Sequence, residues 1–183
     1  MKNVHHVVCG NDKLIRLVLA FGLFLISATI PTQANALPKG GSYHLILNGR
    51  SFHLTKPPAG KSFNESNVGS GVQYEFQTEL GSPWVRFITG SAFNDSFNNL
   101  SYYGGGGQVR RFTLTNGWHI DVGYLAFVMA RQDVNNYQPF PGLLPVTSIG
   151  TKNVAINLTY IPEINQQIKE LVFIQLKLST DIL

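Results

Sequence analysis

Apolar and polar residues alternate along much of this 183-residue chain, a period of two that is typical of β-strands. The alternation is clearest in residues 72–76, 118–124, 154–160 and 172–178. Weaker candidate strands span residues 43–54, 84–93, 100–112 and 143–150. No segment after residue 36 shows the period of a long amphipathic helix. The sequence therefore predicts an all-β fold.

The two faces of these strands indicate which kind of all-β fold to expect. The polar face carries Glu75, Asp121 and Lys177, charges that a dry sandwich core would not tolerate unpaired. Tyrosines and tryptophans cluster near the ends of the predicted strands, as in the aromatic girdles of membrane barrels. These are Tyr43, Tyr74, Trp84, Tyr102, Tyr103, Trp118, Tyr124 and Tyr160. We predict an eight-stranded antiparallel up-and-down transmembrane β-barrel, with a soluble sandwich or lipocalin-like barrel as the alternative.

The N-terminus has the features of an export signal. Three basic residues among the first 16 precede an apolar run, Leu17–Ile30, and Ala34-Asn35-Ala36 then fits a small-residue cleavage site. We predict a signal peptide at residues 1–36 and one barrel domain at residues 37–183. A transmembrane anchor is the alternative, but the run is shorter than the roughly 20 residues that a helical span needs.

Charge and cysteine content exclude several classes of function. The only cysteine, Cys9, lies in the predicted signal, so the exported chain forms no disulfide. Residues 37–183 hold 11 basic and nine acidic residues, a net charge of +2, which indicates no nucleic-acid partner. No spacing of His, Cys, Asp and Glu suggests a metal site, and nothing in the sequence requires a cofactor.

Two stretches carry residues suited to acyl transfer. His53 ends the first predicted strand, and Asp95 and Ser96 follow the third. In an up-and-down barrel both positions lie at the same rim, so the three side chains could meet, deprotonate a hydroxyl and move an acyl group. An Asp-Ser pair in an Asn-rich stretch is also typical of a plain turn, and that interpretation stays open.

Glycines and prolines mark two further unusual places. Residues 104–107 are all glycine and form no phosphate-binding loop, because neither Lys-Ser/Thr nor a helix follows. Such glycines leave room in the lumen, either for an apolar chain or for bulky neighbours. Pro145 and Pro162 lack the N–H of a strand ladder. They would open a gap in the barrel wall, unless both lie in turns outside the strands.

Several short motifs occur in a fixed order along the chain. They are Phe63-Asn64-Glu65, Gly69-Ser70-Gly71, Ala92-Phe93-Asn94-Asp95-Ser96-Phe97-Asn98, Leu143-Leu144-Pro145-Val146-Thr147-Ser148-Ile149-Gly150 and Leu158-Thr159-Tyr160-Ile161-Pro162. With these motifs the chain resembles the PagP-type lipid A palmitoyltransferases, which are eight-stranded outer-membrane barrels. A broader group of small bacterial barrels shares the Phe-Asn-Glu and Asp-Ser pieces.

The resemblance implies a monomeric outer-membrane enzyme that moves a palmitoyl chain from a phospholipid to lipid A without metal or cofactor. The residues that it assigns are the catalytic His53, Asp95 and Ser96, the lateral-gate residues Pro145 and Pro162, and Gly107 at the floor of the acyl pocket.

The chain also departs from the family. An amphipathic helix precedes the barrel in the family, whereas here only residues 37–41 separate the predicted signal from the first strand. The second gate of the family also uses prolines, and this chain has Asn48 and Asn67 there. Two alternatives therefore stay open: a non-catalytic outer-membrane barrel that binds lipid or supports the membrane, and a soluble periplasmic barrel.

Overall fold

The structure is a computed structural model that describes residues 40–57, 60, 62–164 and 168–182, so the predicted signal peptide lies outside the described residues. Its strands are β1 (Ser42–His53), β2 (Ser66–Phe76), β3 (Trp84–Asn94), β4 (Leu100–Thr113), β5 (Trp118–Ala130), β6 (Phe140–Thr151), β7 (Val154–Ile161) and β8 (Leu171–Ser179). The described helical segments are short 3-10 turns, η1 (Thr115–Gly117), η2 (Asn135–Tyr137) and η3 (Thr180–Ile182).

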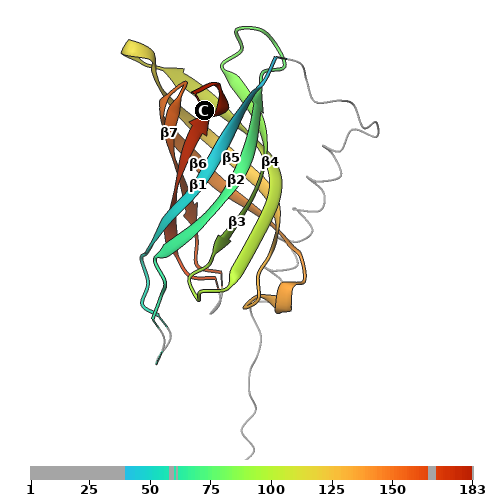
Figure 1. The fold of residues 1–183 in the computed structure, drawn as a ribbon, viewed down its shortest axis with the longest axis vertical. Helices are drawn as coiled ribbons and strands as arrows, with labels where there is room; N and C mark the ends of the chain where they lie inside the picture. The colour runs from blue at the N-terminus through green and yellow to red at the C-terminus, as the bar shows by residue number, and fades with distance from the viewer. Residues whose placement is uncertain (1–39, 58–59, 61, 165–167, 183) are drawn as a thin grey trace, which may run out of the picture. The chain divides into compact units, whose positions relative to one another are not determined.

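Each strand pairs antiparallel with the next along the chain, and β8 returns to pair with β1 (Figure 1). The eight strands therefore form a closed up-and-down barrel, as the alternation predicts. Closure pairs most of the backbone N–H and C=O groups between strands, which is what a β-structure needs in order to cross a bilayer. Within the described residues, no helix is both long and apolar enough to span a membrane.

The apolar face of the strands points outward. In β8 the residues alternate strictly, with Leu171, Phe173 and every second residue after them buried. On the outer face, by contrast, Val72 is 64% exposed and Ile156 45% exposed. A soluble sandwich or barrel would bury such side chains, whereas a membrane barrel turns them to lipid.

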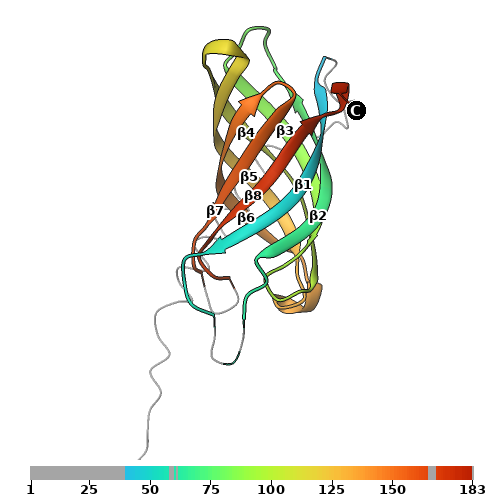
Figure 2. The ribbon, with the colours of Figure 1, turned by 60° about the vertical axis from the view of Figure 1, so that its left-hand side comes forward.

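The two ends of the barrel differ. β1 begins and β8 ends at the same end, which we call the terminal end (Figures 1 and 2). The connections at this end span residues 77–83, 114–117 and 152–153. The opposite end, the loop end, carries the connections at residues 54–65, 95–99, 131–139 and 162–170. Outer-membrane barrels have short periplasmic turns and longer external loops, so the terminal end fits the periplasmic side.

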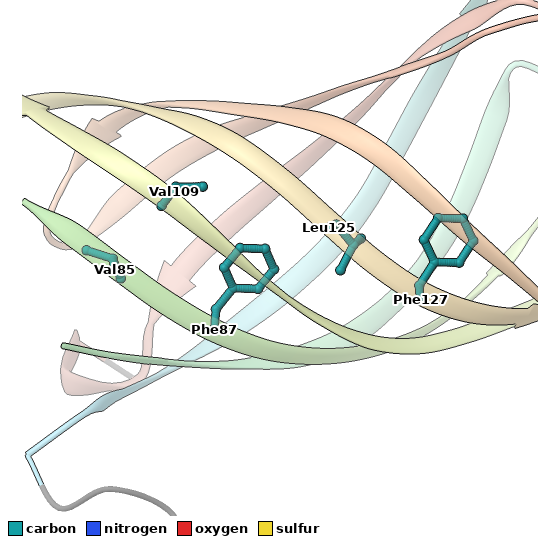
Figure 3. Close-up of a cluster of buried hydrophobic side chains, with 5 residues drawn as sticks. All are labelled: Val85, Phe87, Val109, Leu125 and Phe127. Atoms are coloured by element: carbon teal, nitrogen blue, oxygen red, sulfur yellow. The ribbon is translucent and has the colours of Figure 1, made fainter. Parts of the chain in front are cut away.

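Inward-facing side chains of the described strands fill the lumen in successive layers along the barrel axis. Phe93, Leu171 and Phe173 form an apolar cluster toward the loop end. A second cluster in the middle of the barrel, drawn in Figure 3, consists of Val85, Phe87, Val109, Leu125 and Phe127. Tyr103 and Met129 pack against both clusters, so the apolar side chains form one continuous column.

Below this column, toward the terminal end, lies a group of inward-facing charges that we call the charged floor: the buried Glu75, Asp121 and Lys177 and the partly exposed Arg111. Arg111 donates to both oxygens of Asp121 at 2.8 and 2.7 Å and to Glu75 at 3.1 Å, and Lys177 donates to the other Glu75 oxygen. The inward position predicted for Glu75, Asp121 and Lys177 is confirmed. Mutual pairing within the floor explains how the barrel interior tolerates these charges.

The wall of the barrel is incomplete between β6 and β7. Their ladder runs only from the pair Val146 and Thr159 to the pair Gly150 and Ala155. Pro145 lies within β6 at the point where this ladder stops, and Pro162 directly follows β7. Residues 140–145 therefore pair with β5 alone among the described strands, and this part of the wall is open toward the loop end.

Candidate active site

His53 and Ser96 lie in hydrogen-bonding contact at the loop end. His53 is the last residue of β1, and its Nε2 is 2.9 Å from the Ser96 hydroxyl oxygen. The imidazole stacks on the Phe63 ring, with centroids 3.7 Å apart and an angle of 13° between the planes. This stacking fixes the plane of the imidazole, and Nδ1 is buried without a hydrogen-bond partner among the described residues. The arrangement brings a base and a hydroxyl together, which is what proton abstraction requires.

Asp95 is the buried centre of the turn that carries Ser96. Its carboxylate, 1% exposed, accepts hydrogen bonds from the backbone N–H groups of Phe97 at 2.8 Å and Asn99 at 3.0 Å, and from the Ser101 hydroxyl at 2.9 Å. In the described part of the chain, no hydrogen bond or ion pair joins Asp95 to His53. The structure thus brings His53 and Ser96 together, and gives Asp95 the role of shaping their turn.

Asn64 holds the same turn from the first loop, a role that sequence reasoning missed. Its backbone N–H donates to the Ser96 carbonyl at 2.8 Å, and its side-chain amide donates to the Asp95 carbonyl at 3.1 Å. The Asn64 side chain also accepts from the Ser66 N–H at 3.0 Å, which fixes its orientation. The sequence motif Phe63-Asn64-Glu65 could have indicated this role. It supplies both the Phe63 ring that stacks on His53 and the Asn64 hydrogen bonds to the Asp95–Ser96 turn, which we call the Asn64 clamp.

Arg131 is a second residue that the sequence reasoning did not single out. It follows β5 at the loop end, is mostly buried, and its Nε lies 3.8 Å from the Asp95 carboxylate. Asp133 holds its guanidinium with two hydrogen bonds of 2.9 and 2.8 Å. Arg131, His53 and Ser96 line one small cavity of about 20 Å³, together with apolar residues such as Leu171. The cavity thus lies between the polar site and Leu171, a member of the apolar cluster toward the loop end.

The apolar column begins directly beneath this cavity. His53 pairs across the β1–β8 ladder with Leu171, a member of the first apolar cluster. The column continues inward to Gly107, where the Phe87 ring occupies the place of a side chain: a Cβ at this position would collide with the Phe87 ring and the Tyr124 carbonyl oxygen. Gly107 thus marks a narrow point of the lumen, just above the charged floor.

Asn48 and Asn67 both point inward and are buried, at 7% and 2% exposed. The Asn48 amide donates to the Ser91 hydroxyl at 2.7 Å and accepts from Gln175 at 2.6 Å. The β1–β2 ladder continues past Asn48 through one irregularity at Gly49. The wall is therefore paired on this side of the barrel, unlike the wall beside Pro145.

Among the described residues, no group of three or more His, Cys, Asp and Glu side chains could hold a metal ion.

Comparison with known proteins decides the family. Residues 39–177 match the family described as "Antimicrobial peptide resistance and lipid A acylation protein PagP". This chain belongs to the PagP family. Family membership and the closed barrel together place this PagP-family chain in the outer membrane.

Relatives named "Lipid A acyltransferase PagP" support the assignment. The protein from Bordetella parapertussis is 30% identical over 160 residues, which cover 79% of this chain and 87% of the relative. The protein from Erwinia tasmaniensis is 38% identical over 102 residues, covering 55% and 52% of the two chains. Among solved structures, the crystal structure of Ail from Yersinia pestis aligns with a TM-score of 0.43 at 10% identity, covering 76% of this chain and 96% of that one.

Proposed function

We propose that this protein is a lipid A acyltransferase that moves a fatty acyl chain, palmitoyl in the simplest case, from a phospholipid to lipid A. The observation that carries the proposal is the His53–Ser96 contact at the mouth of an apolar lumen, in a chain of the PagP family. A reactive pair at the head of an apolar column fits a substrate whose ester group must react while its hydrocarbon chain is buried.

In this mechanism His53 is the general base and Ser96 its polar or nucleophilic partner. Nε2 of His53 takes the proton of the attacking hydroxyl, a new ester C–O bond forms at the acyl carbon, and the original phospholipid ester bond breaks. The proton then passes to the departing oxygen, so lysophospholipid leaves as the second product. Asp95 acts as a positioning residue. The Arg131 guanidinium lines the same cavity and would stabilise the negative charge that develops on the carbonyl oxygen.

The open wall beside Pro145 is the proposed path for the acyl chain. Residues 140–145 of β6 lack β7 partners toward the loop end, where His53 and Ser96 lie. A hydrocarbon chain can pass sideways there without breaking ladder hydrogen bonds. Pro145 and Pro162 would keep the gap unpaired, because neither can donate a backbone hydrogen bond. Inside, the chain would lie among the side chains of the apolar column, which would have to shift to admit it, and would reach down toward Gly107.

This proposal includes the surroundings of the enzyme. The loop end faces the cell exterior and meets phospholipid and lipid A in the outer leaflet. The signal peptide at residues 1–36 directs export. The barrel acts as a monomer. The shorter terminal-end turns support the orientation. Closure of β8 on β1 leaves the barrel without terminal edge strands, and among the described strands only the short stretch beside Pro145 lacks a partner on one side, which is consistent with the monomer.

Mass spectrometry of lipid A from expressing cells tests the proposal. Cells with the wild-type chain should gain lipid A species heavier by one acyl chain, and cells with Ser96→Ala should not. Ser70→Ala is the matched control, since Ser70 is exposed on the outer face of β2 and should leave the product unchanged. A folded wild-type barrel that adds no chain would favour the non-catalytic lipid-binding barrel instead.

A further inference from the structure

Two arginines stand side by side on the outer wall near the terminal end. Arg86 of β3 and Arg110 of β4 are both exposed and point away from the lumen. In the β3–β4 ladder Trp84 pairs with Arg110, and Arg86 pairs with Gln108. The arginines are therefore diagonal neighbours on one face, a geometry that places Cβ atoms roughly 7 Å apart. We call them the outer arginine pair.

Neither guanidinium of the outer arginine pair has an acidic partner among the described residues. The neighbouring Arg111 points inward and forms salt bridges with Glu75 and Asp121. Arg50, another outward-facing cation on the described strands, has its own partner in Glu65 at 2.9 Å. Two positive charges thus remain without a counter-charge from the part of the chain that the structure describes.

The surroundings of the pair are those of a membrane interface. Phe112 lies beside Arg110, whose guanidinium carbon is 5.3 Å from the ring centroid. Val122 faces Arg110 from β5 and is 47% exposed. Trp84 is the first residue of β3, and tryptophan in membrane proteins is enriched at the level of the lipid headgroups. The two charges consequently lie where the apolar belt meets the headgroups, and not at the costly bilayer centre.

We propose that the outer arginine pair binds the phosphate of an anionic phospholipid, of the phosphatidylglycerol class, in the periplasmic leaflet. Guanidinium groups bind phosphate through paired N–H donors in a fixed plane, and two of them can share one phosphate. A zwitterionic headgroup would bring a further cation to a site that already holds two. The site lies on the outer wall, away from His53 and Ser96, so it does not depend on the transfer chemistry.

Tryptophan quenching can test the site, because the chain contains only two tryptophans, Trp84 and Trp118. Trp118→Phe leaves Trp84, directly opposite Arg110, as the only probe. This variant is reconstituted into vesicles of phosphatidylcholine that contain a minor fraction of brominated phosphatidylglycerol or, in parallel, brominated phosphatidylcholine. Bromine quenches a nearby indole, so the extent of quenching measures how much each lipid is enriched next to Trp84. We expect phosphatidylglycerol to quench well beyond its mole fraction.

Substitutions assign the enrichment to the pair. Arg86→Gln and Arg110→Gln should each weaken the preference about 5-fold, and the double variant about 30-fold, on the basis of a typical contribution of one basic residue at an anionic surface. A double variant with Arg50→Gln and Lys152→Gln removes the same charge elsewhere and should keep the preference. Equal quenching by both lipids in the Trp118→Phe background overturns the proposal, as does a preference that survives the loss of Arg86 and Arg110.

Discussion

Removal of the Asp95 carboxylate should destabilise the barrel measurably, although this residue lies in a five-residue connection at one end. The carboxylate accepts three hydrogen bonds and is 1% exposed. Hydrogen bonds to a charged group contribute about 1.5 kcal/mol each at the low end of the usual range. Three of them give about 4.5 kcal/mol, so for Asp95→Ala we expect a loss of roughly 4 kcal/mol in the free energy of unfolding.

Asp95→Asn removes the negative charge of the side chain but keeps an oxygen that can accept hydrogen bonds, so it measures the two contributions separately. Its amide oxygen can still accept from the backbone N–H groups of Phe97 and Asn99, so we expect about half of the Asp95→Ala loss. Equilibrium unfolding in urea, followed by tryptophan fluorescence in vesicles, measures both changes. Asp181→Ala is the control: this carboxylate is 58% exposed and its pair with Lys152 is long, at 3.8 Å, so the change should be below about 0.5 kcal/mol. An Asp95→Ala barrel within about 1 kcal/mol of wild type would refute the inferred role of the turn.

Further predictions concern the lumen and the clamp. Gly107→Met should lower the free energy of unfolding, because its Cβ would collide with the Phe87 ring and the Tyr124 carbonyl oxygen, and in the barrels that fold it should shift the transferred chains toward shorter lengths. Urea unfolding reads the stability and mass spectrometry of the acylated lipid A reads the chain lengths; an unchanged distribution would remove Gly107 from the acyl pocket. Glu75→Gln should cost about 3 to 5 kcal/mol in urea unfolding, since it leaves Lys177 buried without its acidic partner; a loss below about 1 kcal/mol would contradict the pairing of the floor. Asn64→Ala should lower the rate of acyl transfer more than it lowers stability, because the side chain clamps the Asp95–Ser96 turn; comparing transfer rates with urea midpoints decides this.

The barrel itself could be predicted from the sequence because its signal is local. Strict alternation fixes which residues of β8 face the lumen, and the inward charges Glu75, Asp121 and Lys177 follow from the same rule. The position of Pro145 stayed open, because the candidate strand at residues 143–150 includes it but a period-two pattern cannot tell a strand residue from one just beyond the strand end; the structure places it inside β6.

The site could be predicted only in part, because its contacts are non-local. Placing two strand ends at one rim suffices to bring His53 near Ser96, which are 43 residues apart in sequence. Sequence spacing cannot show that the Asp95 carboxylate turns toward the N–H groups of its own loop and not toward His53. The Asn64 clamp and the cavity position of Arg131 likewise depend on how separate loops meet, which no strand pattern encodes.

The central claim is that the His53–Ser96 pair transfers an acyl chain between two lipids. The most direct test uses purified protein in vesicles that contain lipid A and a phospholipid with an isotopically labelled acyl chain. We expect labelled lipid A and lysophospholipid in equal amounts from the wild type, and neither product from Ser96→Ala or His53→Gln. Lysophospholipid without labelled lipid A would identify a phospholipase, and equal transfer by Ser96→Ala would contradict the account of the site.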